Sequence, residues 1–447
     1  MKNLVLSNTL TKQKDIFIPL IPNKVSLYVC GITPYDFAHL GHGRCYVVFD
    51  LLFRLFKFLG YDVTYVRNFT DIDDKLVVRS EKEFGDSSRY KDVADKFIAS
   101  FKDDMHKLNC LNPTYEPLVT ENISQIISFV QGLIEKNVAY VLGNDVYFDI
   151  SKFEEYGKLS GRNIEDLLAG ARVSVDVNKR NPQDFALWKG NEEGSYWKSP
   201  WGYGRPGWHI ECSALAKKYL GETIDIHGGG MDLIFPHHEN EIAQSEGLSE
   251  RQFAKFWIHN AFVNINKEKM SKSLGNFFTL KDIFQKYDPM VLRFFYLQHQ
   301  YKTPIEFSFE LLESAQRAYK KLIEVFHVKG GYKATFLIQN LEKYSVASDM
   351  LSALSDDLNS PKLLGILFEN LSEIKKVEDL KVVVGSFLFN VLGLTFDKLK
   401  EEKIEITPEI QSIIDQRNIA RSEKNWKVAD ELRDKLVSMG IEIKDIK

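Results

Sequence analysis

Short apolar runs and amphipathic segments alternate over the first 70 residues. Residues 25–30 have the composition of a buried strand, and residues 44–59 carry apolar side chains at helical spacing until Gly60 ends the pattern. A second apolar run at 63–66 predicts the next strand. Strand, loop, helix and strand in this order open a nucleotide-binding α/β sheet. No GxGxxG sequence follows the first strand, so the dinucleotide-binding type is not indicated.

The pattern changes twice further along the chain. Residues 151–200 are polar and rich in turn signals, which predicts an insertion with its own small fold. A second α/β stretch follows, and long helical segments dominate beyond about residue 311. The expected elements are helices at 92–108, 123–136, 208–219 and 235–246, a strand at 223–227 and a loop at 228–230.

The composition is that of a folded protein. Of 447 residues, 44% are hydrophobic and 27% are charged, which supplies a core and excludes wholesale disorder. The formal net charge of -4 means that a nucleic acid must bind a local basic patch. Four cysteines are too few for a secreted disulfide framework, and neither a signal peptide nor an apolar run of about 20 residues is seen. We therefore expect a cytoplasmic protein without a membrane span.

The first chemical motif is HLGH at residues 39–42, where the first strand passes into its helix and α/β sheets bind nucleotides. His39 and His42 can face one site and donate to phosphate oxygens on which negative charge develops. Gly41 lets a base or phosphate approach the backbone, and the helix N-terminus adds a favourable dipole. Taken alone, these four residues are equally compatible with two histidines in an ordinary loop.

The second motif is KMSKS at residues 269–273, followed by a glycine at 275. Lys269 and Lys272 flank small hydroxyl residues, and a loop of this kind can close over a triphosphate with two ammonium groups. A solvated basic loop is the ordinary alternative, but the full string together with HLGH is far less expected by chance. The pair resembles the HIGH and KMSKS signatures of class I aminoacyl-tRNA synthetases, with Leu40 in place of isoleucine. That resemblance implies catalytic roles for His39, His42, Lys269 and Lys272, with Lys272 also contacting ATP.

A third set of residues has the chemistry of a metal site. Cys30 closes the first strand and Cys212 lies in a predicted helix, while His237 and Glu241 share one helical face at i and i+4. Two thiolates, an imidazole and a carboxylate suit zinc. Spacing alone does not join these residues, because core packing accounts for a lone cysteine and the neighbours His238 and Glu239 are equally available.

Four strings together resemble the cysteinyl-tRNA synthetase family, and the resemblance covers nearly the whole chain. They are YVCG at 28–31, RNFTDIDDK at 67–75, WHIECS at 208–213 and HHENEIAQS at 237–245. The resemblance implies one zinc ion per chain, bound by Cys30, Cys212, His237 and Glu241. It further implies an amino-acid pocket walled by Trp208, with Thr70 and His227 as further pocket residues, and ATP contacts at Gly41, Gly229 and Asp232. A core position for Trp208 and a simple tight turn at 228–230 are the ordinary alternatives.

Zinc gives a physical basis for selecting cysteine over serine, which differs by one atom. An apolar pocket discriminates such near-isosteres only about 100-fold. A zinc ion prefers a thiolate to a neutral hydroxyl, so selection needs no editing domain. Asp71, Asp73 and Asp74 could hold magnesium, although helix capping is our preferred interpretation, and ATP needs Mg²⁺ in any case.

The implied partners are L-cysteine, ATP and the tRNA for cysteine, and we expect a monomer. The C-terminal segment is the implied anticodon reader. Trp426 could stack on a base with Arg417, Arg421 and Arg433 on phosphates, although packing of Trp426 between two helices is the preferred interpretation. Alternatives are a cysteine ligase of thiol biosynthesis that uses an amino-sugar acceptor, and a non-catalytic RNA-binding paralogue.

The implied fold class is α/β: a Rossmann-type parallel-sheet catalytic domain with an inserted small domain, then an all-helical tRNA-binding region and a small C-terminal domain. The boundaries that we predict are 1–120 and 206–260 for the two catalytic halves, 121–205 for the insertion, 261–310 for the KMSKS-bearing stem-contact region, 311–400 for a helical bundle and 401–447 for the anticodon-binding region.

Overall fold

The computed structural model describes residues 3–162, 179–194, 196–265, 268–269, 277–332, 338–399 and 408–438. The chain divides into two compact units, Met1–Asp397 and Lys398–Lys447, which are described separately. None of the helices in these ranges is long and apolar enough to cross a bilayer.

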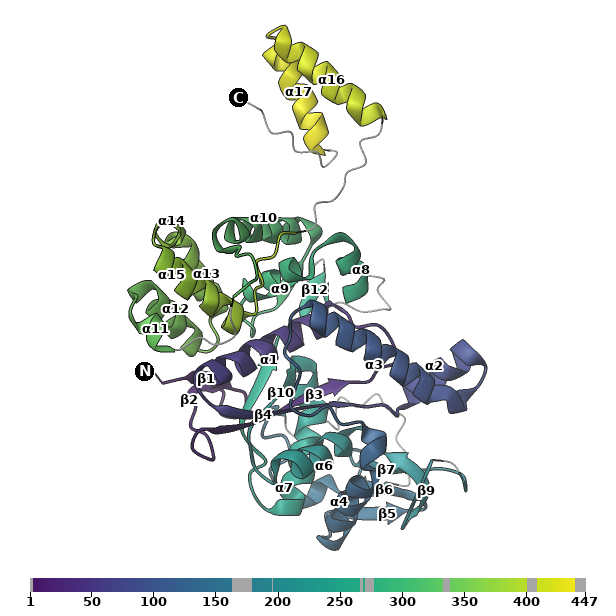
Figure 1. Cartoon of the computed structure of the whole chain (residues 1–447). Coiled ribbons are helices and arrows are strands. Elements are labelled where there is room, and N and C mark those ends of the chain that lie inside the picture. The colour runs from purple at the N-terminus through teal and green to yellow at the C-terminus, as the bar shows by residue number, and fades with distance from the viewer. Residues whose placement is uncertain are drawn as a thin grey trace. The chain divides into compact units, whose positions relative to one another are not determined.

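A parallel four-stranded sheet forms the centre of the first unit (Figure 1). The strand order is β11-β10-β3-β4, and each neighbouring pair is parallel. Every residue of β10 except Gly230 is buried, as expected for a strand that is covered on both faces. The predicted α/β class with a parallel sheet is therefore confirmed. The strands are β3 (Lys24–Ile32), β4 (Asp62–Phe69), β10 (Ile224–Gly230) and β11 (Ala254–Asn260).

Helices cover both faces of this sheet. The predicted helix after the first strand is α1 (Leu40–Phe58), which packs on β4, β10 and β11. On the other face, α6 (Trp208–Leu220) packs on β3 and β4, and α7 (Glu239–Ser249) packs on α6 (Figure 1). Gly60 follows α1 with a φ of +89°, a conformation that favours glycine and explains why the helix ends there. The outer helices are α2 (Asp74–Phe84), α3 (Tyr90–Lys107) and α4 (Ile123–Glu135).

Two predicted elements differ from the structure around β10. The glycines at 228–230 belong to β10 rather than to a loop. A Cβ on Gly228 would lie 2.3 Å from the Phe49 ring of α1. Close packing of helix on strand therefore requires glycine at 228. The predicted helix at 235–246 is a π-helical segment at Ile234–His238 followed by α7 from Glu239, and it is kinked because Phe235 has extended backbone (φ −139°, ψ 132°). The residue before a proline is disfavoured in helical conformation, and Pro236 follows Phe235.

The chain segment between β4 and β10 forms an antiparallel five-stranded sheet. Its order is β5-β6-β7-β9-β8. Trp188 is fully buried in it and meets the ring of Trp201 edge-on at 5.9 Å. Helix α4 packs on β5 and also on α6 and α7. The strands are β5 (Ala139–Leu142), β6 (Asp145–Phe148), β7 (Phe185–Gly190), β8 (Trp197–Ser199) and β9 (Gly202–Pro206).

The rest of the first unit consists of two small sheets and a group of helices. A hairpin of β1 (Val5–Asn8) and β2 (Gln13–Ile16) contacts β11. A three-stranded sheet contains β12 (Val263–Ile265), β13 (Glu268–Lys269) and β14 (Ile305–Phe307). The helices are α8 (Leu280–Lys286), α9 (Pro289–Leu297), α10 (Phe309–Phe326), α11 (Ile338–Glu342), α12 (Ser345–Ser355), α13 (Ser360–Glu369), α14 (Leu371–Lys376) and α15 (Glu378–Phe387).

The second unit is a helical hairpin of α16 (Pro408–Ser422) and α17 (Trp426–Ser438). Its small core is formed by Ile410, Ile413 and Leu436. The pairing follows from apolar residues at helical spacing on each helix.

A buried ionic cluster fastens α1 to α9. Asp50 accepts from Arg54 Nε at 2.8 Å, from Arg293 Nη2 at 2.5 Å and from the amide of Leu111 at 2.7 Å. Although burial raises the pKa of Asp50, the two guanidinium groups lower it below its ordinary value. A depressed folded-state pKa contributes stability that is complete above the unfolded pKa, about 4, and is lost as the pH falls below it.

Asp50→Asn should therefore lower the free energy of unfolding of the first unit by about 3–5 kcal/mol, because Arg293 is left buried without a counter-ion. Urea unfolding at neutral pH measures this, and the difference from wild type should shrink below about pH 4. Asp356→Asn is the matched control: it breaks the exposed Lys14–Asp356 pair and should cost less than about 1 kcal/mol. Equal losses in the two variants would contradict the assignment.

Candidate active site and metal centre

A cavity of about 600 Å³ opens beside the carboxyl ends of β3, β10 and β11. This edge of a parallel sheet is where α/β folds bind ligands. Of the predicted site residues, it is lined by Cys30, His39, Gly41, His42, Trp208 and Asp232. Residues from the nucleotide motif and from the candidate metal set therefore face one space.

HLGH forms the first turn of α1 instead of the predicted loop. His39 is the N-cap, and its Nδ1 accepts from the amide of His42, while Nδ1 of His42 accepts from the amide of His39, both at 3.3 Å. The two imidazole rings stack with their centroids 3.7 Å apart. This reciprocal capping fixes both rings and places them at the positive end of the helix dipole.

The KMSKS motif is only partly within the described residues. The backbone of Lys269, the last residue of β13, pairs with Asn264 of β12, whereas Lys272 lies outside the described ranges. Arg44, two residues beyond HLGH, is buried and donates to the carbonyl groups of Ala261 and Phe262 at 2.8 and 2.7 Å. The guanidinium thus ties the start of α1 to the strands that lead into KMSKS.

A bulge in β3 places Cys30 at the cavity. Val29 is registered with Arg67 and Ile32 with Phe69, so Cys30 and Gly31 lie opposite a single residue of β4, Asn68. A Cβ on Gly31 would lie 1.5 Å from the backbone oxygen of Asn68, so only glycine fits. The bulge re-aims the Cys30 side chain relative to a regular strand.

Cys30, Cys212, His237 and Glu241 form one compact set, here called the four-donor group. One donor atom from each lies within 4.8 Å of the others, and all four side chains are buried. The two sulfur atoms are 3.7 Å apart, and Glu241 Oε1 lies 3.4 Å from Cys30 Sγ and 3.1 Å from His237 Nε2. Two sulfur ligands about 2.3 Å from a tetrahedral zinc ion lie about 3.8 Å apart. The donor set and its spacing therefore fit zinc.

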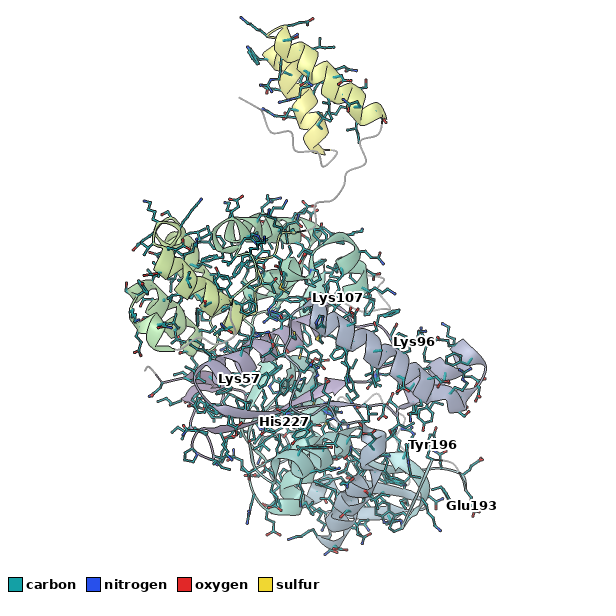
Figure 2. All side chains as sticks on the ribbon, viewed as in Figure 1. Lys57, Lys96, Lys107, Glu193, Tyr196 and His227 are labelled. Carbon is teal, nitrogen blue, oxygen red and sulfur yellow. The ribbon has the colours of Figure 1, made fainter. Side chains whose placement is uncertain are left out.

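A second set overlaps the first and consists of Cys30, His227, His238 and Glu241. It contains one sulfur instead of two, and its His227 Nε2 is already at hydrogen-bond distance, 2.8 Å, from Glu241 Oε2. We therefore favour the four-donor group as ligands and assign His227 an orienting contact to Glu241. Figure 2 labels His227, which is fully buried in the first unit, and the exposed Lys57 of α1 and Lys96 of α3. Glu239 is excluded from the site because its carboxylate accepts backbone amides of Gly157 and Ser160.

Burial and mutual charge set the protonation of the four-donor group. Burial raises the pKa of Glu241, but the charges of His227 and His237 outweigh it and lower the pKa to about 2. Burial lowers the pKa of His237, but Glu241 raises it to about 10. The hydrogen bond from Cys30 lowers the pKa of Cys212 to about 6, whereas burial and Cys212 raise that of Cys30. A dication that enters this group replaces protons, so metal binding should release protons and weaken at acid pH.

Of the three predicted pocket residues, Trp208 lines the cavity and the other two do not. Trp208 is 42% exposed and lines the cavity with its ring centroid 4.5 Å from that of His237, so the core alternative is wrong. Thr70 and His227 are buried and are not among the lining residues; Thr70 donates to Glu211 Oε2 at 2.7 Å. Gly229 is likewise not a lining residue, whereas its neighbours Gly230 and Asp232 line the cavity.

The acidic string at 71–74 is structural, as preferred. Asp73 caps α2 by accepting the amide of Lys75 at 2.9 Å, and Asp71 accepts the amide of Thr120 at 3.0 Å. Asp74 pairs with Arg205 and Lys189 of the five-stranded sheet. These carboxylates therefore hold elements together.

Of the polar residues behind the four-donor group, His238 was an open alternative ligand in the sequence, whereas His209, His259 and Asn68 were not predicted as site residues. His209 Nδ1 lies 2.9 Å from His237 Nδ1, which leaves Nε2 of His237 for the metal. His238 lies 3.3 Å from Cys30 Sγ through Nε2 and 2.7 Å from His259 through Nδ1. A polar residue at an inward position of a buried strand, as His259 and Asn68 are, is the sequence signal that could have revealed them.

The four predicted RNA-contact residues of the second unit are not equally placed. Arg417 is 3% exposed, so its side chain does not present itself on the surface. Trp426 is 59% exposed, which shows that the preferred packing between the two helices is wrong. Arg421 is half-buried, and the exposed Arg433 pairs with Asp430 at 2.9 Å and with Asp434 at 3.2 Å.

Comparison with known proteins adds independent evidence. Residues 16–317 match the family model for the class I (C) tRNA synthetase catalytic domain, and residues 404–447 match that for the cysteinyl-tRNA ligase anticodon binding domain. A cysteine–tRNA ligase of Trichlorobacter lovleyi is 45% identical over 99% of this chain and 98% of its own. A cysteine–tRNA ligase of Geobacillus thermodenitrificans is 46% identical over 100% of this chain and 98% of its own. The methionyl-tRNA synthetase of Mycobacterium tuberculosis in complex with methionyl-adenylate is 12% identical, with a TM-score of 0.54 over 83% of this chain and 92% of its own, a likeness of fold alone.

Proposed function

The chain belongs to the cysteine–tRNA ligase family, and from this premise we propose that it activates L-cysteine with ATP and transfers it to the 3′-terminal adenosine of its tRNA. The observation that carries the proposal is the shared cavity, which holds Cys30 of the four-donor group and both histidines of HLGH. On this proposal, a thiol-selective site and a phosphate site lie within one small molecule's reach.

In the first step, a carboxylate oxygen of cysteine attacks the α-phosphorus of ATP. A new O–P bond forms, the bond to the β-phosphate bridging oxygen breaks, and the electron pair leaves with pyrophosphate. His39 and His42 donate to the phosphate oxygens as charge develops, from rings already fixed by reciprocal capping. Lys269 and Lys272 are the proposed further cations. The reaction needs no protein nucleophile, so the chain contributes position and charge.

Substrate selection depends on the four-donor group. Bound there, a zinc ion supplies a Lewis acid that prefers a thiolate to a neutral hydroxyl and so favours cysteine over serine. Trp208 forms the wall next to His237 and limits the space above the group. Asp232, on the β10 side of the cavity, is placed to accept ribose hydroxyl groups of ATP, which itself binds with Mg²⁺.

In the second step, a hydroxyl group of the terminal adenosine attacks the carbonyl carbon of the adenylate. The ester bond forms, AMP leaves with the electron pair, and the hydroxyl proton passes to solvent or phosphate. The cavity is open at the surface, so the end of an RNA strand can enter it.

The decisive experiment has two parts. Cysteine-dependent exchange of pyrophosphate into ATP tests activation, with serine as the control amino acid, and charging of purified tRNA tests the acceptor. We expect exchange with cysteine only, and cysteine attached to tRNA. Exchange without charging, together with capture by an amino sugar, would identify the thiol-biosynthesis alternative. Absence of exchange would leave a binding function.

The second unit offers one prediction on the RNA side. Trp426→Ala should raise KM for tRNA in the charging reaction about 10-fold, because stacking on a base contributes about 1–3 kcal/mol, and should leave pyrophosphate exchange unchanged. Val428→Ala, at a second exposed apolar position on α17, is the matched control. Equal KM values for wild type and Trp426→Ala would remove the stacking role.

A further inference from the structure

We propose that Asn68 is a positioning residue that sets the spacing of the two sulfur ligands; this inference rests on the zinc site of the proposed function. Asn68 is 1% exposed and is the next-to-last residue of β4, opposite the β3 bulge. Its side chain contacts Gly31, the neighbour of Cys30 in β3, and Cys212 of α6, which are far apart in sequence. Cys30 departs from regular strand geometry directly opposite Asn68.

The amide oxygen of Asn68 is held by two donors from β3. It accepts the amide of Gly31 at 3.0 Å and the hydroxyl of Tyr28 at 3.2 Å. These two donors require the oxygen of the side-chain amide to face β3, since its NH₂ group in that place would set donor against donor. Because Gly31 is the second residue of the bulge, its bond to Asn68 holds the backbone that carries Cys30.

The same side chain reaches α6. Cys212 Sγ lies 3.6 Å from the Asn68 amide oxygen. Asn68 Nδ2 donates to Thr70 Oγ1 at 3.4 Å, and Thr70 donates to Glu211 Oε2 at 2.7 Å, one residue before Cys212. This chain of hydrogen bonds joins the end of β4 to the helix turn that presents the second sulfur.

Removal of the Asn68 side chain has a defined consequence. It leaves the Gly31 amide and the Tyr28 hydroxyl buried without an acceptor, at a place where a backbone oxygen already crowds Gly31. The bulge can satisfy these donors only by shifting, and a shift moves Cys30 away from Cys212. Loss of an orienting residue of this kind typically lowers metal affinity about 10- to 100-fold.

The test measures zinc retention rather than turnover. Zinc-loaded full-length protein is mixed with a chromogenic chelator, and the rate of zinc release is compared between wild type and variants. Asn68→Ala should release zinc at least about 10-fold faster. Tyr28→Phe removes one of the two donors and should give a smaller increase, about 3-fold. KM for cysteine in pyrophosphate exchange should rise in both variants, while KM for ATP stays within about 2-fold.

Asn122→Ala is the matched control, since Asn122 is equally buried and hydrogen-bonded but lies away from the four-donor group. It should release zinc at the wild-type rate even if it is destabilised as much as Asn68→Ala in urea. Zinc release at the wild-type rate from Asn68→Ala, or equal acceleration in Asn122→Ala, would overturn the positioning role. Wild-type protein that retains no zinc would instead refute the metal site of the proposed function.

Discussion

Replacing Cys212 by serine should lower cysteine-dependent pyrophosphate exchange at least about 1000-fold and remove most of the bound zinc. A serine hydroxyl keeps its proton at neutral pH and is a poor zinc ligand, so the four-donor group loses one of its two sulfur donors. The change is nearly isosteric at a buried position, so the fold should persist. Zinc content by atomic absorption and exchange rates measure the two effects.

The control for that variant is Cys110→Ser. Cys110 is a partly buried thiol whose sulfur lies 3.7 Å from Arg293 Nη1, outside the four-donor group. It should retain zinc and exchange activity within about 2-fold. Cys212→Ser protein that keeps one zinc per chain and discriminates against serine as wild type does would exclude Cys212 as a ligand.

His42→Asn should lower pyrophosphate exchange about 100- to 1000-fold without weakening cysteine binding or zinc retention. Removal of one preorganised donor to a developing charge commonly costs this much. Asparagine is the informative substitution, because its Oδ1 can replace Nδ1 of His42 as acceptor for the His39 amide while the outward Nε2 donor is lost. Pre-steady-state exchange and equilibrium cysteine binding separate the two contributions.

His106→Asn, on the outer helix α3, controls for loss of an imidazole far from the cavity and should behave as wild type. If His42→Asn lowered cysteine binding and exchange equally, the ring would serve substrate binding or local folding rather than charge stabilisation. If neither changed, the phosphate role would pass to other groups of the cavity.

Much of the fold could be predicted because hydrophobic periodicity reports local structure directly. The strand at 25–30 and the helix at 44–59 are confirmed within a few residues of their bounds. The predictions that are wrong involve tertiary contacts that periodicity does not encode. Gly228 looks like a loop residue until the Phe49 ring that packs over it is known. The kink in the helical segment ahead of α7 depends on the extended backbone of Phe235, the residue before a proline.

The candidate site could likewise be predicted only in part. The sequence names Cys30, Cys212, His237 and Glu241 only through family resemblance, whereas the folded chain brings their donor atoms together. Asn68 escaped prediction because its role depends on a bulge in the neighbouring strand, a register feature invisible in one sequence. Trp426 was misjudged because helical periodicity in α17 suggests a packed ring, but the two-helix unit leaves it exposed.

The strand order β11-β10-β3-β4 also dictates when the site can assemble during synthesis. β3 and β4 leave the ribosome together, but β10, the other neighbour of β3, follows only after the whole five-stranded sheet has been made. That antiparallel sheet has local pairings and can fold in the interval. Until α6 and the segment through α7 have been made, the Cys30 thiol lacks its partners Cys212, His238 and Glu241. Nascent chains that end before Cys212 should therefore present a reactive thiol that becomes protected only once the chain has been extended through α7.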